Sequence, residues 1–329
     1  MKFLDAKSDT DCDTSHMKTE GHTEELNGGL RERWEEPVIW HYVVTTMLIH
    51  AGCLAAPFYF SWSGLVVAVV LFFVVGCLGV TVGYHRMLTH TSFKTYRAIR
   101  YFLTLCGCMG HFGGPLSWVG THRLHHARSD SDDDPHTPRH GLIWSHITYV
   151  YYQEPASDKS LDTVKDLQRE PALVFLEKWS VAPVVLCLAG LYLAGELYST
   201  LILDRGSFGA GLGLSWLAWG GFVRMTVMFH AAGSVNSVTH TYGYRNFDTP
   251  DNSRNLWWVA LMTFGEGWHN NHHAQQRSAA HGMRWWEFDV SYRVIKTMQW
   301  LGLAWDVVEP KPSSSDSVNV SDAKSESVQ

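Results

Sequence analysis

The longest stretch of the chain that lacks any charged residue restricts its fold more than any other feature. This stretch runs from Val38 to Tyr84 and contains no Asp, Glu, Lys or Arg. A bilayer core requires about 20 apolar residues per helix, so the stretch is long enough for two membrane spans and a short turn. We predict spans at residues 38–58 and 64–82, joined by an aromatic turn of the kind found at the headgroup interface.

Two further apolar stretches follow in the second half of the chain. Residues 179–203 are interrupted only by Glu196, and residues 208–233 carry Arg224. A lone arginine in mid-membrane costs about 2.5–3.5 kcal/mol on insertion scales, so Arg224 is expected to face protein, a polar cavity or the interface. The sequence therefore predicts an all-α integral membrane protein with four transmembrane helices.

The parts of the chain outside these spans differ in composition. Residues 1–37 are acidic, poor in apolar side chains and unlike a targeting segment, so we predict a disordered cytosolic tail. Residues 310–329 are rich in Ser and predict a second disordered tail, which leaves residues 38–309 as one membrane domain. Residues 96–114 are too short and glycine-broken for a span, which favours an interfacial or re-entrant segment. Residues 140–178 are amphipathic and predicted to lie outside the membrane.

Histidines form three clusters with regular spacing. The clusters are His85 and His90; His122, His125 and His126; and His269, His272 and His273. Residues three and four apart share one face of a helix, so each triplet is expected to point its rings the same way. Neutral imidazole is the commonest protein ligand for zinc, copper and iron, so the triplets predict a metal site.

The spacing of the first cluster is different. At about 100° per residue, five positions turn a straight α-helix by about 140°, so His85 and His90 do not share a face. They would serve either two metals, or one metal after a local break in the helix. This spacing fits a dinuclear centre better than a mononuclear one.

All the clusters are predicted to emerge on the face of the membrane that carries the N-terminus. Two spans precede the first cluster, and two more separate the second cluster from His240. Arg205 is the only basic residue assigned to the far face, whereas the histidine side carries many. These are Arg31, Arg33, Arg86, Lys94, Arg97, Arg123, Arg128 and Lys159. By the positive-inside bias the histidine side is the cytoplasm, so we predict a cytosolic helical cap with both termini on that side.

The number of histidines restricts the chemistry. The cluster histidines, with His240 as a further candidate, are too many for one ion, because zinc takes four ligands or three plus water. No H-E-x-x-H sequence is present, which argues against a zinc protease. Two metals with four or five nitrogens each account for the number, and iron fits a site with an open position for oxygen chemistry. Such a centre suits an inert substrate in the bilayer, for which an acyl chain is the obvious candidate.

Other residues have weaker assignments. Asp134 follows the second cluster and is a candidate partner for a metal-bound imidazole, but a solvated acidic loop explains it equally well. His41 and His50, within the first predicted span, are interpreted as packed or interfacial. The other histidines outside the clusters are interpreted as structural or solvated: His136, His140, His146 and His230. Six cysteines without a C-x-x-C pair are interpreted as buried small hydrophobes. A net charge of −6 without a basic stripe argues against a nucleic-acid partner.

In combination, these motifs resemble the membrane fatty-acid desaturases, most closely the Δ9 acyl-lipid and acyl-CoA group of cyanobacteria and plants. The resemblance rests on the H-x4-H of His85 and His90 and on the two H-x-x-H-H boxes. Asp134-Pro135-His136 and Gly265-Glu266-Gly267-Trp268 add to it, and it covers roughly residues 40–305. The resemblance implies an enzyme that uses O2 and two external electrons to place a cis double bond in a saturated acyl chain.

The resemblance also implies a di-iron centre held by nine histidines and one water-mediated asparagine. Carried over by position, the ligands are His85, His90, His122, His125, His126, His240, His269, His272 and His273, and Asn236 holds a metal-bound water. Asp134 and His281 are candidates for contacts behind these ligands. The acyl carrier stays open between acyl-lipid, acyl-CoA and acyl-ACP.

The electron donor is expected to be a separate protein, either ferredoxin or cytochrome b5. His111-Phe112-Gly113-Gly114 is only faintly similar to the haem motif of cytochrome b5, because phenylalanine departs from it. The residues on either side of this sequence also cannot form a cytochrome b5 domain.

Two other functions stay open. A membrane hydroxylase with a similar histidine pattern would be separated from a desaturase by product analysis. A non-catalytic metal carrier would place ionisable residues along the spans at mid-membrane. The histidine clusters are predicted at one face instead, so the sequence favours an oxygen-dependent oxidoreductase.

Overall fold

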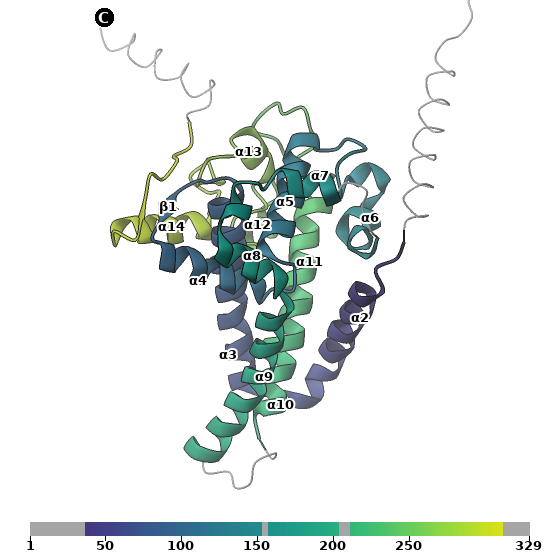
Figure 1. Cartoon of the computed structure of the whole chain (residues 1–329), viewed down its shortest axis with the longest axis vertical. Helices are drawn as coiled ribbons and strands as arrows, with labels where there is room; N and C mark the ends of the chain where they lie inside the picture. The colour runs from purple at the N-terminus through teal and green to yellow at the C-terminus, as the bar shows by residue number, and fades with distance from the viewer. Residues whose placement is uncertain (1–36, 153–156, 204–210, 312–329) are drawn as a thin grey trace, which may run out of the picture.

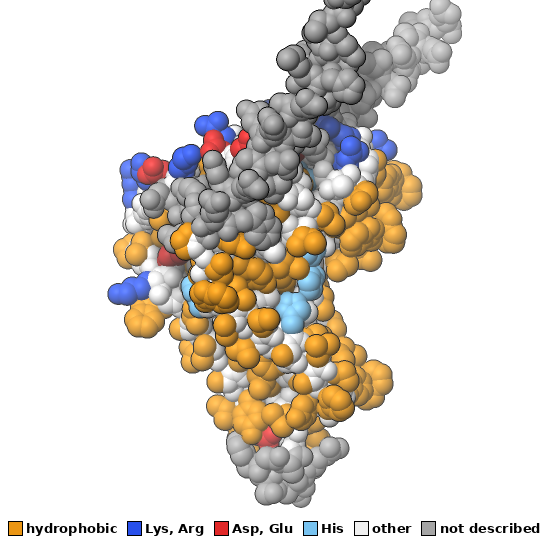
Figure 2. Space-filling view, turned by 90° about the vertical axis from the view of Figure 1, so that its right-hand side faces the viewer, with side chains coloured by type: hydrophobic (Ala, Val, Ile, Leu, Met, Phe, Trp, Pro, Cys, Tyr) orange, Lys and Arg blue, Asp and Glu red, His pale blue; other side chains and the backbone are white. Residues whose placement is uncertain are grey.

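The computed structural model describes residues 37–152, 157–203 and 211–311. Both predicted tails therefore lie almost wholly outside the described residues. Long helices stand together in one half of the molecule, and short helices and loops form a cap on the other half (Figure 1). Figure 2 shows hydrophobic side chains covering the long helices, while Lys and Arg gather over the cap. The distribution is that of a protein whose long helices face lipid.

The charge-free stretch folds into two long helices, as predicted. α2 (Trp40–Ala55) ends in the 3-10 turn η1 (Ala56–Tyr59). Ser61 then caps α3 (Trp62–Leu71), because its Oγ accepts a hydrogen bond from a backbone N–H of the first turn at 3.0 Å. α3 continues without a break into the π-helical segment η2 (Phe72–Thr89).

Three helices of the described residues are long and apolar enough to cross a membrane. They are Trp40–Tyr59, Trp62–Thr89 and Val181–Ile202, the last of which joins α9 (Val181–Leu197) to η6 (Tyr198–Ile202). They correspond to the first three predicted spans.

The fourth predicted span overlaps an unbroken helix that is less apolar. It consists of α10 (Gly213–Trp216), η7 (Leu217–Val223) and α11 (Arg224–Ser237), and it packs against α3 and α9. Arg224 is only 2% exposed, and its Nε donates a hydrogen bond to the Gly220 carbonyl at 2.7 Å. The prediction that Arg224 faces protein is therefore confirmed.

Shorter elements surround the long helices and form most of the cap. The helices are α4 (Arg97–Cys108), α5 (Pro115–Arg128), α6 (Leu142–His146), α7 (Ser157–Asp162), α8 (Pro171–Lys178), α12 (Trp257–Met262), α13 (His269–Ala274) and α14 (Val290–Trp300). The 3-10 turns are η3 (Pro138–His140), η4 (Thr148–Tyr151) and η5 (Leu167–Arg169). α4 occupies the segment predicted to be interfacial or re-entrant.

The C-terminal part of the described chain ties distant loops of the cap together. Strand β1 (Lys94–Thr95) pairs antiparallel with β2 (Ala304–Trp305). Beyond β2, the Val308 N–H donates to the Ser92 carbonyl at 2.9 Å, and the Val308 carbonyl accepts from the Ala279 N–H at 2.8 Å. This segment therefore connects the residues after η2 with those after α13.

Glycines allow α4 to lie directly against η2. A Cβ atom at Gly79 would be 2.4 Å from the Gly107 backbone nitrogen, well inside van der Waals contact. The close approach matters for function because η2 ends at the first histidine cluster. Any change in the spacing of α4 and η2 will therefore also move these histidines.

We expect Gly79→Ala to destabilise the fold by about 1–3 kcal/mol, because the new methyl group forces two backbones apart. The matched control is Gly190→Ala in α9, where an added Cβ meets nothing within 4 Å. That control should be neutral or slightly stabilising, since alanine is the better helix former. Thermal unfolding of the detergent-solubilised protein measures both changes, and equal melting temperatures for the two variants would contradict the prediction.

Candidate metal centre

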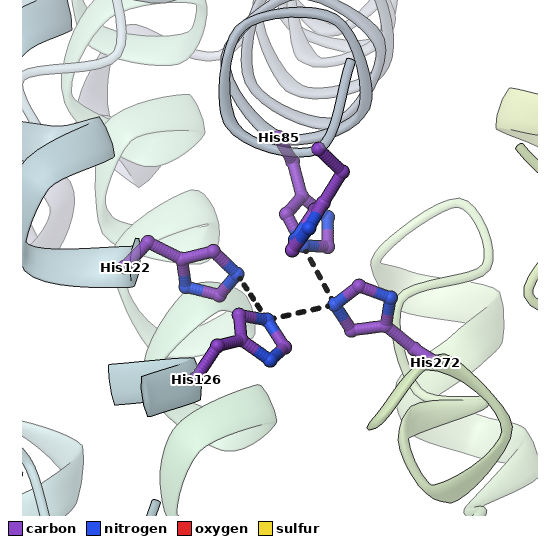
Figure 3. A group of neighbouring side chains, drawn as sticks. His85, His122, His126 and His272 are labelled. Atoms are coloured by element: carbon purple, nitrogen blue, oxygen red, sulfur yellow. Dashed lines mark hydrogen bonds between the residues drawn. The ribbon is translucent and has the colours of Figure 1, made fainter. Parts of the chain in front are cut away.

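Nine histidines from four parts of the chain converge in the cap and divide into two groups. The five-histidine group is His85, His90, His122, His126 and His272; the four-histidine group is His125, His240, His269 and His273. Within each group, one ring nitrogen per residue lies within 4.8 Å of all the others. Figure 3 shows four rings of the five-histidine group pointing toward one another from η2, α5 and α13.

The π-helical geometry of η2 brings His85 and His90 together. The His90 N–H donates to the His85 carbonyl at 3.1 Å, which is the i→i+5 bond of a π-helix. Residues five apart therefore come close to one face, and the two ring centroids are 4.8 Å apart. The structure does not place these histidines in two different groups. The other alternative, one group reached through a local departure from the α-helix, is what the structure shows.

The rings of each histidine triplet point toward the centre, but the three rings of a triplet do not all belong to the same group. In α5, His122 and His126 lie one turn apart in the five-histidine group, and His125 belongs to the other group. In α13 the pattern is reversed, since His272 alone joins the five-histidine group. The two groups are neighbours, with the His126 and His273 ring centroids 4.6 Å apart.

Carboxylates stand behind four of the nine rings. Asp134 Oδ2 lies 2.9 Å from His125 Nδ1, and this side chain is fully buried. The alternative of a solvated loop at Asp134 is therefore wrong. The other pairs are Asp130 Oδ1 with His240 Nδ1 at 3.0 Å, Asp251 Oδ2 with His273 Nδ1 at 2.9 Å, and Glu266 Oε2 with His85 Nδ1 at 2.6 Å.

The protonation of these rings tests whether the site fits a metal. A neutral imidazole whose Nδ1–H faces a carboxylate has its lone pair on Nε2. In the four-histidine group, Nε2 of His269 lies 3.0 Å from that of His240 and 3.1 Å from that of His273. His125 Nε2 is 3.4 Å from His273 Nε2. Such converging lone pairs repel one another unless a cation lies between them, so the donor set fits a metal ion.

The electrostatics of the centre keep the rings available as ligands. Burial lowers the pKa of His122, His126, His269 and His272 well below its ordinary value, and the neighbouring imidazoles lower it further. Burial alone would raise the pKa of the Asp251 carboxyl, but the hydrogen bond and charge of His273 hold it well below its usual range. The carboxylates are therefore ionised while most of the rings are neutral.

A buried ion network supports the centre from one side. The fully buried Arg86 pairs with Glu266 Oε1 at 3.0 Å and with Asp289 Oδ2 at 2.9 Å. His281 Nδ1 lies 3.1 Å from Glu266 Oε2, and its ring centroid is 4.2 Å from that of His272. Glu266 therefore links a histidine of the five-histidine group to an arginine.

Asn236 and the remaining histidines lie outside both groups. Asn236 Nδ2 donates to the Tyr149 hydroxyl at 3.4 Å, and both residues line the cavity described below. His136 is 3% exposed, which excludes solvation and leaves a packed position beside His125. His146 and His230 belong to a separate hydrogen-bonded row, with 3.1 Å between His146 Nε2 and His230 Nδ1.

A largely apolar cavity of about 500 Å³ adjoins the histidines. Its walls come mainly from α2, η2, α5 and α11, and include Phe72, Val80 and Met228. His85, His122, His269 and Asn236 also face it; among the described residues that line it there is no Lys or Arg. The arrangement suits an apolar ligand held beside a metal centre.

Comparison with known proteins agrees with this geometry. Residues 60–299 match the family model described as "Fatty acid desaturase". The chain is 42% identical to the sn-1 stearoyl-lipid 9-desaturase of Anabaena variabilis over 82% of its own length and 93% of that relative. It is 38% identical to the Delta-9 acyl-lipid desaturase 1 of Arabidopsis thaliana, over 82% and 83% of the two chains. An acyl-CoA 5-desaturase of Anemone leveillei is 40% identical over 84% and 81%.

Proposed function

Since the chain belongs to the fatty acid desaturase family, we propose that it inserts a cis double bond at the Δ9 position of a saturated acyl chain. The observation that carries this proposal is the convergence of nine histidines, in groups of five and four, beside an apolar cavity. The Δ9 position rests on the names of the relatives, one of which acts at position 5 instead.

The two histidine groups are proposed to hold two iron ions. Their donor sets fit, because each offers four or five imidazole nitrogens within 4.8 Å and most of these rings are neutral. When bound, the iron pair would supply, with O2 and two external electrons, the oxidising power to remove hydrogen from saturated carbon. Asn236 is proposed to hold a water next to the four-histidine group, which has one ligand fewer.

The protein's own contribution is to position the acyl chain and to exclude water. Apolar side chains of η2 and α11 would hold the chain, while His122 and His269 stand where the cavity meets the centre. The carboxylates behind His85, His125, His240 and His273 fix the orientation and tautomer of these rings. Because the buried rings are preorganised, an acyl chain can be oriented without rearranging the site.

The membrane arrangement is proposed to include four spans, the fourth being the helix from α10 to α11. The cap and its histidines would then face the cytoplasm, where ferredoxin or cytochrome b5 delivers electrons. Lys and Arg on the cap support this orientation (Figure 2). The described residues do not include three of the basic residues on which the predicted orientation also depends, namely Arg31, Arg33 and Arg205.

The proposal is tested by expressing the chain in a bacterium together with ferredoxin and its reductase. The cells receive deuterium-labelled stearic acid, and mass spectrometry of derivatised fatty acids locates any new double bond. We expect labelled product unsaturated between carbons 9 and 10. A variant with alanine at both His125 and His272, which loses one ligand from each group, should give none. A hydroxylated product, or a double bond at another position, would contradict the proposal.

A further inference from the structure

The two histidine groups differ in the charge that stands behind them. In the four-histidine group, three of the four rings have an aspartate at Nδ1, at 2.9–3.0 Å. In the five-histidine group, His85 alone has a carboxylate there, namely Glu266. Among the described residues, the other four rings have no such partner, and Nδ1 of both His126 and His272 is buried without a hydrogen bond.

The single carboxylate of the five-histidine group has a buried cation beside it, which it shares with Asp289. Glu266 pairs with the buried Arg86 guanidinium at 3.0 Å. By contrast, within the described chain Asp130, Asp134 and Asp251 have no Lys or Arg within ion-pair distance, and their ion-pair partners are histidines alone. The four-histidine group therefore faces three carboxylates with which no Lys or Arg of the described chain pairs.

Backbone contacts hold these three aspartates in place. The Asp130 N–H donates to Asp134 Oδ2 at 3.0 Å, and Asp130 Oδ2 accepts from the Asn252 N–H at 2.5 Å, next to Asp251. Asp130 has a φ of +59°, a left-handed conformation that costs energy for a residue with a side chain. The loops after α5 and before α12 are therefore fixed so that the carboxylates cannot swing away from the rings.

We propose that Asp130, Asp134 and Asp251 make the four-histidine group the one that stabilises the more oxidised iron. A carboxylate behind an imidazole makes the ring a stronger donor, and nearby negative charge stabilises the higher positive charge on the ion. If one electron were removed from a bound ferrous pair, the ferric ion would form in the four-histidine group. This inference rests on the proposed function, since it assumes an iron pair, and it assigns these aspartates as positioning and charge-setting residues.

Mössbauer spectroscopy of the full chain loaded with 57Fe tests the inference. The ferrous protein should show two quadrupole doublets, one for each group. One equivalent of ferricyanide per protein takes one electron from one Fe2+, giving Fe3+ and ferrocyanide. We expect one doublet to convert to a ferric signal while the other stays. Asp251→Asn removes one charge and keeps an acceptor at His273, and Glu266→Gln is the matched change at His85.

The two variants identify which group is oxidised. Asp251→Asn should shift the doublet that converts first and leave more of it ferrous, whereas Glu266→Gln should shift the doublet that stays. The inference would be overturned if both doublets became ferric to the same extent. It would also be overturned if the doublet that Glu266→Gln shifts became ferric first. A protein that shows two doublets but makes no unsaturated product would contradict the proposed function. The order in which its two doublets are oxidised would still test the inference. Fewer than two bound irons would overturn both.

Discussion

Replacing His272 with alanine should lower the rate of double-bond formation by at least about a hundredfold, because loss of even an outer partner of a metal ligand costs 10–100-fold. His272 is fully buried in the centre of the five-histidine group. Its Nε2 lies 2.9 Å from His126 Nε2 and 3.1 Å from His85 Nε2 (Figure 3).

The measurement combines product analysis with the iron content of the purified protein. We expect the His272→Ala variant to insert in the membrane in normal amount, to bind less than two irons and to give no product. His41→Ala is the control, because His41 is an exposed residue of α2 that belongs to neither group. A His272→Ala protein with full activity and two irons would show that the five-histidine group is not a metal site.

Replacing Arg86 with methionine should destabilise the protein by about 3–5 kcal/mol, because it leaves buried carboxylates without a partner. Arg86 is fully buried and binds Glu266, Asp289 and the Ala279 carbonyl. Its loss therefore separates the end of η2 from the loop after α13. We expect a lower melting temperature in detergent and a smaller folded fraction in membranes.

Two comparisons separate this effect from the loss of an ordinary ion pair. Arg100→Met breaks a partly exposed pair with Glu170 at 2.7 Å, and pairs near the surface typically contribute about 0–1 kcal/mol. Adding Glu266→Gln and Asp289→Asn to Arg86→Met removes the unpaired charges, and should recover part of the lost stability. If Arg86→Met and Arg100→Met had equal melting temperatures, the buried network would not have the importance assigned to it.

The sequence was sufficient to select the histidines that converge, because their spacing and number already indicated a metal site. It was insufficient to divide them between two groups. The placement of His85 with His90 depends on a π-helix, and the argument from spacing assumed α-helical geometry. Likewise, the i, i+3, i+4 rule says that a triplet shares a face. It does not say that the middle ring in α5, His125, will join a second group.

Most of the carboxylates were missed for a different reason. Asp130 lies 110 positions from His240 and meets it only because two loops fold against each other. Asp251 belongs to a loop without any motif, and Glu266 was part of a recognised motif that gave no hint of its contact with His85. Asp134 was a candidate because it follows its partner closely in sequence. The membrane helices needed no long-range information, since each apolar run is local.

The contacts of Val308 with Ser92 and Ala279 have a consequence for biogenesis. The ribosome releases the N-terminal spans long before it has made α13, and the closing residues after β2 come later still. During synthesis, the imidazoles of η2 and α5 are therefore exposed without their counterparts. Metal capture by the proposed centre is therefore expected after synthesis of the C-terminal residues, and premature termination near residue 300 is expected to yield an inserted but metal-free polypeptide.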